Sequence, residues 1–351
     1  MKQYASDLQT FLGMNEIEVK VYENEQYLQS MKEAKRLEQL ELEWTVDPFV
    51  ETILNSLKNF GSIEMRTQTS SIEFTRAKNK QAQLQVVTTK KTIDDVKLIL
   101  QKEITIDGTD IRGCCMSAEG GMLYTDYQVK DASLTVIASD YKLKYKMLIN
   151  PSYGFDITLV DESTVAITSA DSQVKDGIDI IDIKNQRKIK FIALPGRSWG
   201  ITRDHDSLFV CVDKLGIYKV NTLEGTTSRV IRCNLPVCSY VAVYTDKIYY
   251  TNYEDDSVFC CDRNGTRVWA FKDEFVLKEP VGIAVDNNGN VYVVGEKSSN
   301  VVIISSDGKH HTELLTEDNG LTSPSAIFLD RENRKLFVAN TMKTAFLYNI
   351  S

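Results

Sequence analysis

One acidic turn offers the plainest case for metal chemistry. The stretch from Asp286 to Asn290, Asp-Asn-Asn-Gly-Asn, begins like a calcium-binding loop, whose aspartate and asparagine oxygens hold the ion. Such loops place glycine at their sixth position, whereas Gly289 is the fourth residue counted from Asp286. The sequence therefore predicts a plain turn between two strands, and no bound metal or other cofactor.

A second group of polar residues follows short apolar runs at regular intervals. In the repeat described below they end the second strand of a unit, at Asp126, Ser169, Asp213, Asn252 and Asn340. If the units form a ring, these residues lie around one of its mouths. Two interpretations stay open. The side chains either hold local backbone turns, or they form a rim for a ligand, including the metal of a lactonase-like hydrolase.

A third group combines aromatic rings with arginine. Tyr153, Trp199 and Tyr240 occupy the same repeat position in three successive units, and Arg112 occupies it in a more divergent unit, while Arg197 lies nearby. These residue types anchor peptides at interfaces or stack on single-stranded bases. The alternative is that the rings pack between neighbouring units in the core.

Catalytic motifs and a basic field are both missing from the sequence. It has no Gly-x-Ser-x-Gly, P-loop or dinucleotide fingerprint, and only three histidines. The net charge is −8, and residues 1–60 hold 6 basic and 11 acidic residues, so the remainder carries only −3. A near-neutral chain does not attract nucleic acid through its overall charge. The sequence therefore predicts a non-enzymatic protein, for which a protein or peptide partner is favoured over RNA.

Cysteine usage and hydropathy bear on location. The seven cysteines show no Cys-x-x-Cys spacing, which favours reduced, buried thiols. No apolar run approaches the length of a membrane helix, and the start lacks a signal-peptide pattern. We expect a cytoplasmic protein without a membrane partner.

A repeat supplies the elements that would position these residues. A small residue or valine recurs every 41 to 46 residues, at Gly113, Gly154, Gly200, Val241, Gly282 and Ala326. Each unit contains about four short β-rich runs separated by turn residues, which is typical of a propeller blade. The last unit ends after its third run, and residues 96–106 alternate well enough to complete it by pairing with the end of the chain. The prediction is a mainly β fold, a six-bladed β-propeller over residues 96–351.

The part before the propeller has a different composition. Residues 1–36 are acidic and helix-prone, with a short heptad seam at Ile17, Val21, Leu28 and Met31. They predict either a coiled-coil segment that forms a homodimer or a solitary amphipathic helix. Residues 37–66 predict a small strand-helix-strand cap, and polar residues 67–95 predict a linker.

The unit "PVGIAVDNNGNVYVV" from Pro280, together with the acidic helical segment, resembles the tripartite-motif (TRIM) proteins that carry NHL repeats. The resemblance implies an NHL-like propeller behind a coiled coil, with a role in recognising ubiquitin-ligase substrates, or RNA binding as in some relatives. The family's RING and B-box zinc modules are missing, since no cysteine precedes Cys114. Where the family has an arginine at the start of the third strand, the unit has Asn300.

Overall fold

The computed structural model describes residues 39–44, 63–68, 92–128, 130–172 and 175–351. The chain divides into two compact units, Met1–Val87 and Thr88–Ser351. In the first unit, β1 (Gln39–Trp44) pairs antiparallel with β2 (Ile63–Gln68). These strands fall on or next to the predicted cap; the helix expected between them, the helix expected in residues 1–36 and most of the linker lie outside the described residues.

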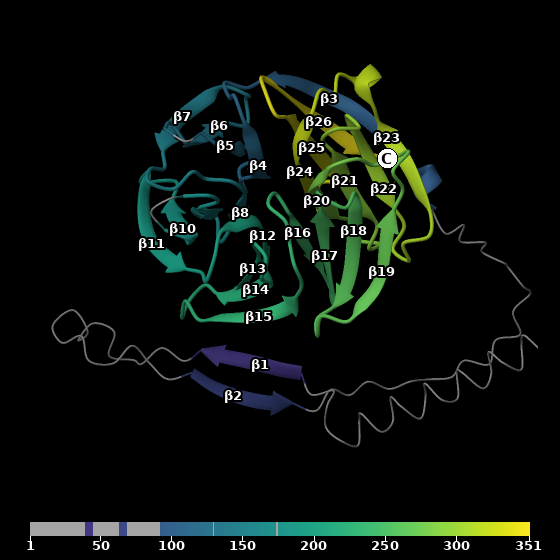
Figure 1. Cartoon of the computed structure of the whole chain (residues 1–351). Helices are drawn as coiled ribbons and strands as arrows, with labels where there is room; N and C mark the ends of the chain where they lie inside the picture. Colours follow the sequence, from purple (N-terminus) through teal and green to yellow (C-terminus); the bar gives the residue numbers. More distant parts are fainter. Residues whose placement is uncertain (1–38, 45–62, 69–91, 129, 173–174) are drawn as a thin grey trace, which may run out of the picture. The chain divides into compact units, whose positions relative to one another are not determined.

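The second unit is a six-bladed β-propeller, as the repeat predicted (Figure 1). Each blade is a four-stranded antiparallel sheet. The first three blades consist of β4 (Ile111–Met116), β5 (Met122–Asp126), β6 (Ser133–Ile137) and β7 (Leu143–Leu148); β8 (Ile157–Leu159), β9 (Thr164–Thr168), β10 (Gly177–Asp182) and β11 (Arg187–Ala193); and β12 (Ser198–Asp204), β13 (Ser207–Val212), β14 (Gly216–Asn221) and β15 (Thr227–Arg232).

The last three blades consist of β16 (Val241–Tyr244), β17 (Lys247–Asn252), β18 (Ser257–Asp262) and β19 (Arg267–Lys272); β20 (Pro280–Val285), β21 (Val291–Gly295), β22 (Asn300–Ile304) and β23 (His311–Leu315); and β24 (Pro324–Asp330), β25 (Lys335–Asn340), β26 (Thr344–Ile350) and β3 (Leu98–Thr105). Two short 3-10 helices, Ile93–Asp95 and Glu317–Asn319, accompany them. Within the described residues, no helix has the length and apolarity to cross a membrane.

The ring closes through strand β3, which comes from the N-terminal side of the propeller. It pairs antiparallel with β26, so that Ile104 lies opposite Ala345 (Figure 1, blue beside yellow). Both residues are buried, and the sixth blade thereby gains its outer strand. Pairing the first and last strands of the propeller in one sheet covers an edge of β26 that would otherwise be exposed.

The first strand of each blade lies nearest the axis, and these inner strands contact one another around the ring. The aligned glycines permit this approach. A Cβ atom on Gly200 would lie 2.4 Å from the Cα of Tyr240, and one on Gly113 would lie 2.7 Å from the Cα of Asp156. The repeat position that identified the blades is therefore occupied by small residues for a packing reason.

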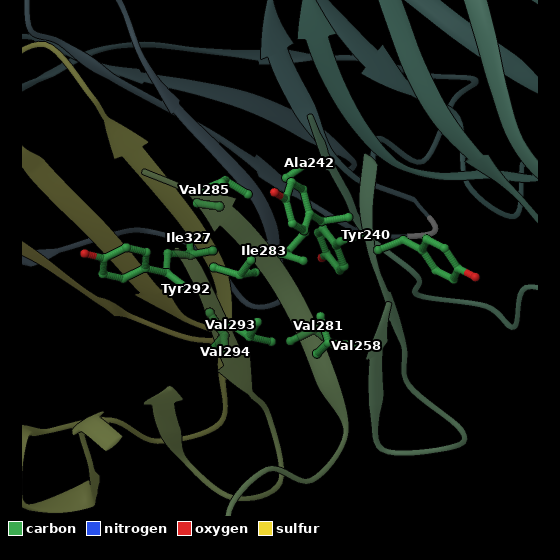
Figure 2. Packing of buried hydrophobic residues seen from close by; sticks show 14 of the residues in the cluster. Tyr240, Ala242, Val258, Val281, Ile283, Val285, Tyr292, Val293, Val294 and Ile327 are labelled. Carbon is green, nitrogen blue, oxygen red and sulfur yellow. The ribbon is translucent and has the colours of Figure 1, made fainter. Parts of the chain in front are cut away.

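The propeller has two faces, which we call top and bottom according to the direction of the inner strands. The top face carries the loops that lead into the inner strands and the turns between second and third strands. The bottom face carries the ends of the inner strands, at Asp204, Tyr244, Val285 and Asp330. Valine, isoleucine and aromatic side chains pack between the blades; Figure 2 labels Ala242, Ile283 and Ile327 from three successive inner strands.

Candidate functional site

A cavity of about 300 Å³ lies along the axis of the propeller. Inner-strand residues of all six blades line it. Arg112 and Tyr240 belong to its top end, and Arg203 and Arg331 belong to its bottom end. The two ends of this cavity, which we call the axial channel, differ in how their charged side chains are paired.

The top end is held by a network of partly buried ion pairs. The Nε of Arg112 lies 2.6 Å from Asp110, and its Nη1 lies 2.9 Å from Glu296, which belongs to the fifth blade. Burial opposes the charge on Arg112, but the acidic groups around it, Glu296 and Asp110 among them, hold its pKa above the usual value. Arg112 therefore stays charged and joins blades that are distant in the sequence.

Tyr240 reaches across the ring to the same place. Its hydroxyl donates a hydrogen bond of 2.6 Å to the backbone oxygen of Arg112, which lies in the opposite blade. Its ring packs 5.2 Å from Phe155, which also meets Trp199 edge-on at 4.9 Å and Tyr127 edge-on at 5.8 Å. Side chains from four blades thus meet over the axis and close this end of the channel.

This packing corrects the expectation that the three repeat-related aromatics line an open mouth. Trp199 and Tyr240 are each only 4% exposed, because they pack around Phe155 in the core. The positions of these two residues agree with the alternative interpretation, in which the rings pack between neighbouring blades in the core. Tyr153 differs, since it is half-buried and meets Tyr127 edge-on at 6.2 Å.

Of the two arginines predicted with the aromatics, only Arg197 remains accessible. Its side chain is 39% exposed and lies 3.2 Å from both Asp171 and Asp213. Arg112 is 16% exposed and belongs to the network under the top face. Tyr127, Tyr153, Asp171, Arg197 and Asp213 together form what we call the top-face cluster.

The predicted rim residues hold the chain around them. Asp126 accepts hydrogen bonds from the backbone N–H groups of Thr109 and Asp110. Asn252 accepts two from the turn that follows it, at Glu254 and Asp255. The contacts of Asn252 match the interpretation in which polar side chains support local backbone turns, whereas those of Asp126 hold a loop that is distant in the sequence.

Two further rim residues accept hydrogen bonds from backbone that is more distant in the sequence. Ser169 accepts a hydrogen bond of 2.8 Å from the backbone N–H of Gly177. Asn340 accepts one from the N–H of Thr322. Asp213 differs, because its carboxylate pairs with Arg197 and so contributes to the top-face cluster.

A threonine one position before the rim residue escaped notice in the sequence. The Oγ1 atoms of Thr125 and Thr168 accept hydrogen bonds from inner-strand N–H groups, those of Gly113 and Asp156. Thr251 does the same for the N–H of Tyr240. A threonine directly before the rim residue recurs in three blades, as Thr-Asp, Thr-Ser and Thr-Asn. This repeated pair is the sequence signal that could have predicted these threonine hydrogen bonds.

Asp156 is a carboxyl group in the wall of the channel. Its two oxygens accept hydrogen bonds of 2.8 Å from the N–H groups of Ile157 and Ile201, and so connect the second and third blades. Burial raises the pKa of Asp156 to about 7, although these two donors act in the opposite direction. Neither its type nor its spacing distinguished it in the sequence.

The acidic turn at Asp286 is a plain turn, as predicted. One carboxylate oxygen accepts hydrogen bonds from the N–H groups of Asn288 and Asn290, and Gly289 adopts a positive φ of 80°. Across the part of the chain that the structure describes, no group of three histidine, cysteine or acidic side chains is arranged to hold a metal ion.

Comparisons with known proteins agree on the fold. A family model described as a beta-propeller repeat (SBBP) matches residues 276–299. No curated protein sequence matches the chain. Among solved structures, a protein of unknown function from Bacteroides thetaiotaomicron is similar, with a TM-score of 0.59 and 13% identity over 71% of this chain and 76% of that one.

Two lyase structures are similar as well. A virginiamycin B lyase from Staphylococcus aureus has a TM-score of 0.53 and 17% identity, over 72% of this chain and 99% of that one. A streptogramin B lyase has a TM-score of 0.51 and 16% identity, over 73% and 98%. At these identities the likeness shows the propeller fold alone.

Proposed function

We propose that this chain is a non-enzymatic interaction scaffold whose propeller binds a protein or peptide partner on its top face. The observation that carries the proposal is the contrast between buried and accessible side chains there. Tyr240, Phe155 and Trp199 close the channel, while Tyr127, Tyr153 and Arg197 remain accessible above the first three blades. The proposal assigns no lyase activity to this chain, although two similar structures are named as lyases.

The top-face cluster has the chemistry of a protein interface. Tyrosine and arginine are enriched among residues that dominate binding energy, because they combine a large contact area with hydrogen-bonding groups. Asp171 and Asp213 flank the Arg197 guanidinium and restrict its position before any partner arrives. A pre-positioned side chain loses less conformational freedom on binding.

The same pairing favours a protein partner over RNA. Both arginines that the sequence singled out are neutralised by carboxylates, Arg197 by Asp171 and Asp213, and Arg112 by Asp110 and Glu296. Phosphate binding would compete with these carboxylates. Dimerisation through residues 1–36, membership in the tripartite-motif proteins and a role in recognising ubiquitin-ligase substrates remain parts of the proposal.

The test compares partner capture by two double variants of the full chain. Tyr153→Ala/Arg197→Ala removes the accessible part of the top-face cluster. Tyr141→Ala/Arg187→Ala removes the same residue types elsewhere, where Tyr141 is 39% exposed and Arg187 pairs loosely with Asp182. Bound proteins would be quantified from lysate with and without nuclease, after both variants are shown to fold by circular dichroism.

We expect a protein that the wild type and the Tyr141/Arg187 variant retain, and that the Tyr153/Arg197 variant loses at least tenfold. Recovery that depends on intact nucleic acid would replace the proposal with the RNA-binding alternative. Equal recovery by all three proteins would show that the top-face cluster is not the partner site.

A further inference from the structure

The bottom end of the axial channel has a different character from the top. The wall of the channel is of mixed polar and apolar character, and its apolar side chains at this end come from the fourth, fifth and sixth blades: Val243, Ile283, Val285, Ile327 and Leu329. The wall ends at two arginines, Arg203 and Arg331, at the finish of the inner strands. Arg203 is exposed, so this end of the channel reaches solvent.

Arg331 is a half-buried cation without a carboxylate partner. Its Nε donates a hydrogen bond of 2.6 Å to the backbone oxygen of Val285, and its Nη2 donates one of 3.1 Å to that of Val243. Its guanidinium lies 4.9 Å from the centre of the Tyr244 ring. Burial lowers the pKa of Arg331, and no described carboxylate lies within ion-pair distance of it.

The guanidinium is therefore fixed in place with hydrogen-bonding capacity left over. The two carbonyl oxygens engage two of its five N–H donors. The remaining donors include the whole Nη1 group. A guanidinium held in this way fits a carboxylate, which can accept two parallel hydrogen bonds.

The carboxylates near this end, Asp204, Asp286 and Asp330, already have partners. Asp204 pairs with Arg263 at 2.7 Å. Asp330 accepts hydrogen bonds from the N–H groups of its own turn, at Glu332 and Asn333. Arg203 makes one hydrogen bond, from its Nε to the backbone oxygen of His205 at 2.7 Å. Two cationic groups thus remain free to meet an anion.

We propose that the axial channel is a binding site for a small monocarboxylate with an apolar body, whose carboxylate lies against Arg331 and Arg203 and whose apolar body lies along the inner strands. This site is separate from the top-face cluster and does not depend on the proposed partner. A volume of about 300 Å³ is at the lower end of small-molecule pockets, and the apolar part of the mixed wall can pack against a short aliphatic chain.

The orientation of the ligand follows from the two ends of the channel. The top end offers Asp156, a carboxyl group whose ionised form would repel an anion, and Arg112, which two carboxylates already neutralise. The bottom end offers unpaired guanidinium groups. An anionic head group is therefore stabilised only at the bottom.

Binding of octanoate to the full chain, measured by isothermal titration calorimetry, tests the proposal. Octanol and octylammonium serve as probes with the same apolar body but a different head group, and inorganic phosphate serves as an anion without one. The variants are Arg331→Gln and Arg203→Gln. Arg197→Gln is the matched control, because it removes an accessible arginine from the top face.

We expect octanoate to bind the wild type and Arg197→Gln equally, and to bind Arg331→Gln and Arg203→Gln about 10- to 100-fold more weakly, since each loses a charge-assisted hydrogen bond. Octanol, octylammonium and phosphate should bind at least tenfold more weakly than octanoate. If Arg331→Gln does not fold, the exposed Arg203 still gives a decisive result. Absence of octanoate binding at millimolar concentration, equal binding of octanol, or unchanged affinity in Arg203→Gln would overturn the proposal.

Discussion

The two ends of the axial channel each hold an arginine, and the two residues have opposite surroundings. Arg112 at the top contacts two carboxylates and lies beneath the Tyr240 ring system. Arg331 at the bottom contacts two backbone oxygens and one aromatic face. At these two ends of the channel, the Arg112 guanidinium, which is 16% exposed and paired with two carboxylates, stabilises the fold, whereas Arg331 keeps spare donors that are available to a ligand.

The largest expected effect is on stability at the top end. Arg112→Gln leaves Asp110 and Glu296 without their partly buried cation, so the free energy of unfolding should fall by about 2–3 kcal/mol. Urea denaturation followed by circular dichroism measures it. Because the loss comes from uncompensated charge, Arg112→Gln/Glu296→Gln should be more stable than the single variant. A loss below about 1 kcal/mol would mean that the network is solvated.

A smaller loss is expected from the contact across the ring. Tyr240→Phe removes only the hydroxyl that donates to the backbone oxygen of Arg112, and should cost about 1–2 kcal/mol in the same denaturation experiment. The control is Tyr153→Phe, since Tyr153 is half-buried and its change should stay within about 0.5 kcal/mol. Equal effects of the two variants would argue that Tyr240 does not bridge the blades.

The bottom end should tolerate loss of its arginine. Arg331→Gln removes hydrogen bonds to two backbone oxygens that water from the channel can replace, so we expect a cost of about 1 kcal/mol in the free energy of unfolding. A small loss of stability combined with weakened octanoate binding would distinguish Arg331, as a ligand-binding residue, from the structural Arg112. If Arg331→Gln destabilised the protein as much as Arg112→Gln, both arginines would be structural.

A pH-dependent effect is expected from Asp156 in the wall of the channel. The folded state holds the Asp156 proton up to about pH 7, whereas the unfolded chain releases it near the usual aspartate pKa of 3.8. The contribution of this group to stability is therefore largest below pH 3.8 and declines as the pH rises toward 7. The Asp156→Asn variant has no carboxyl group at this position, so its stability lacks this pH dependence.

Melting temperatures of wild type and Asp156→Asn, measured at pH 5 and pH 8, check the sign. The melting temperature of the wild type should exceed that of the variant by more at pH 5 than at pH 8. The difference between the two melting temperatures should therefore become smaller as the pH rises. A gap that widens toward pH 8 would show that the two N–H donors stabilise the ionised carboxylate more than burial opposes it.

Much of the propeller could be predicted because its information is local and repeated. Small residues such as Gly113, Gly200 and Gly282 recur at nearly regular intervals, since inner strands approach their neighbours closely at this position. The site was less accessible to prediction. Trp199 and Tyr240 have the residue types of an interface, and only their packing on Phe155 shows that they belong to the core.

The sequence by itself determined the six-bladed architecture and the turn chemistry at Asp286, because strand alternation and turn geometry depend on neighbouring residues. Tertiary structure alone decided the rest. Closing the ring brings Arg112 to Glu296, which is 184 residues away, and leaves Arg331 without such a partner. Whether an arginine is paired depends on which blades meet across the axis, and no local pattern records that.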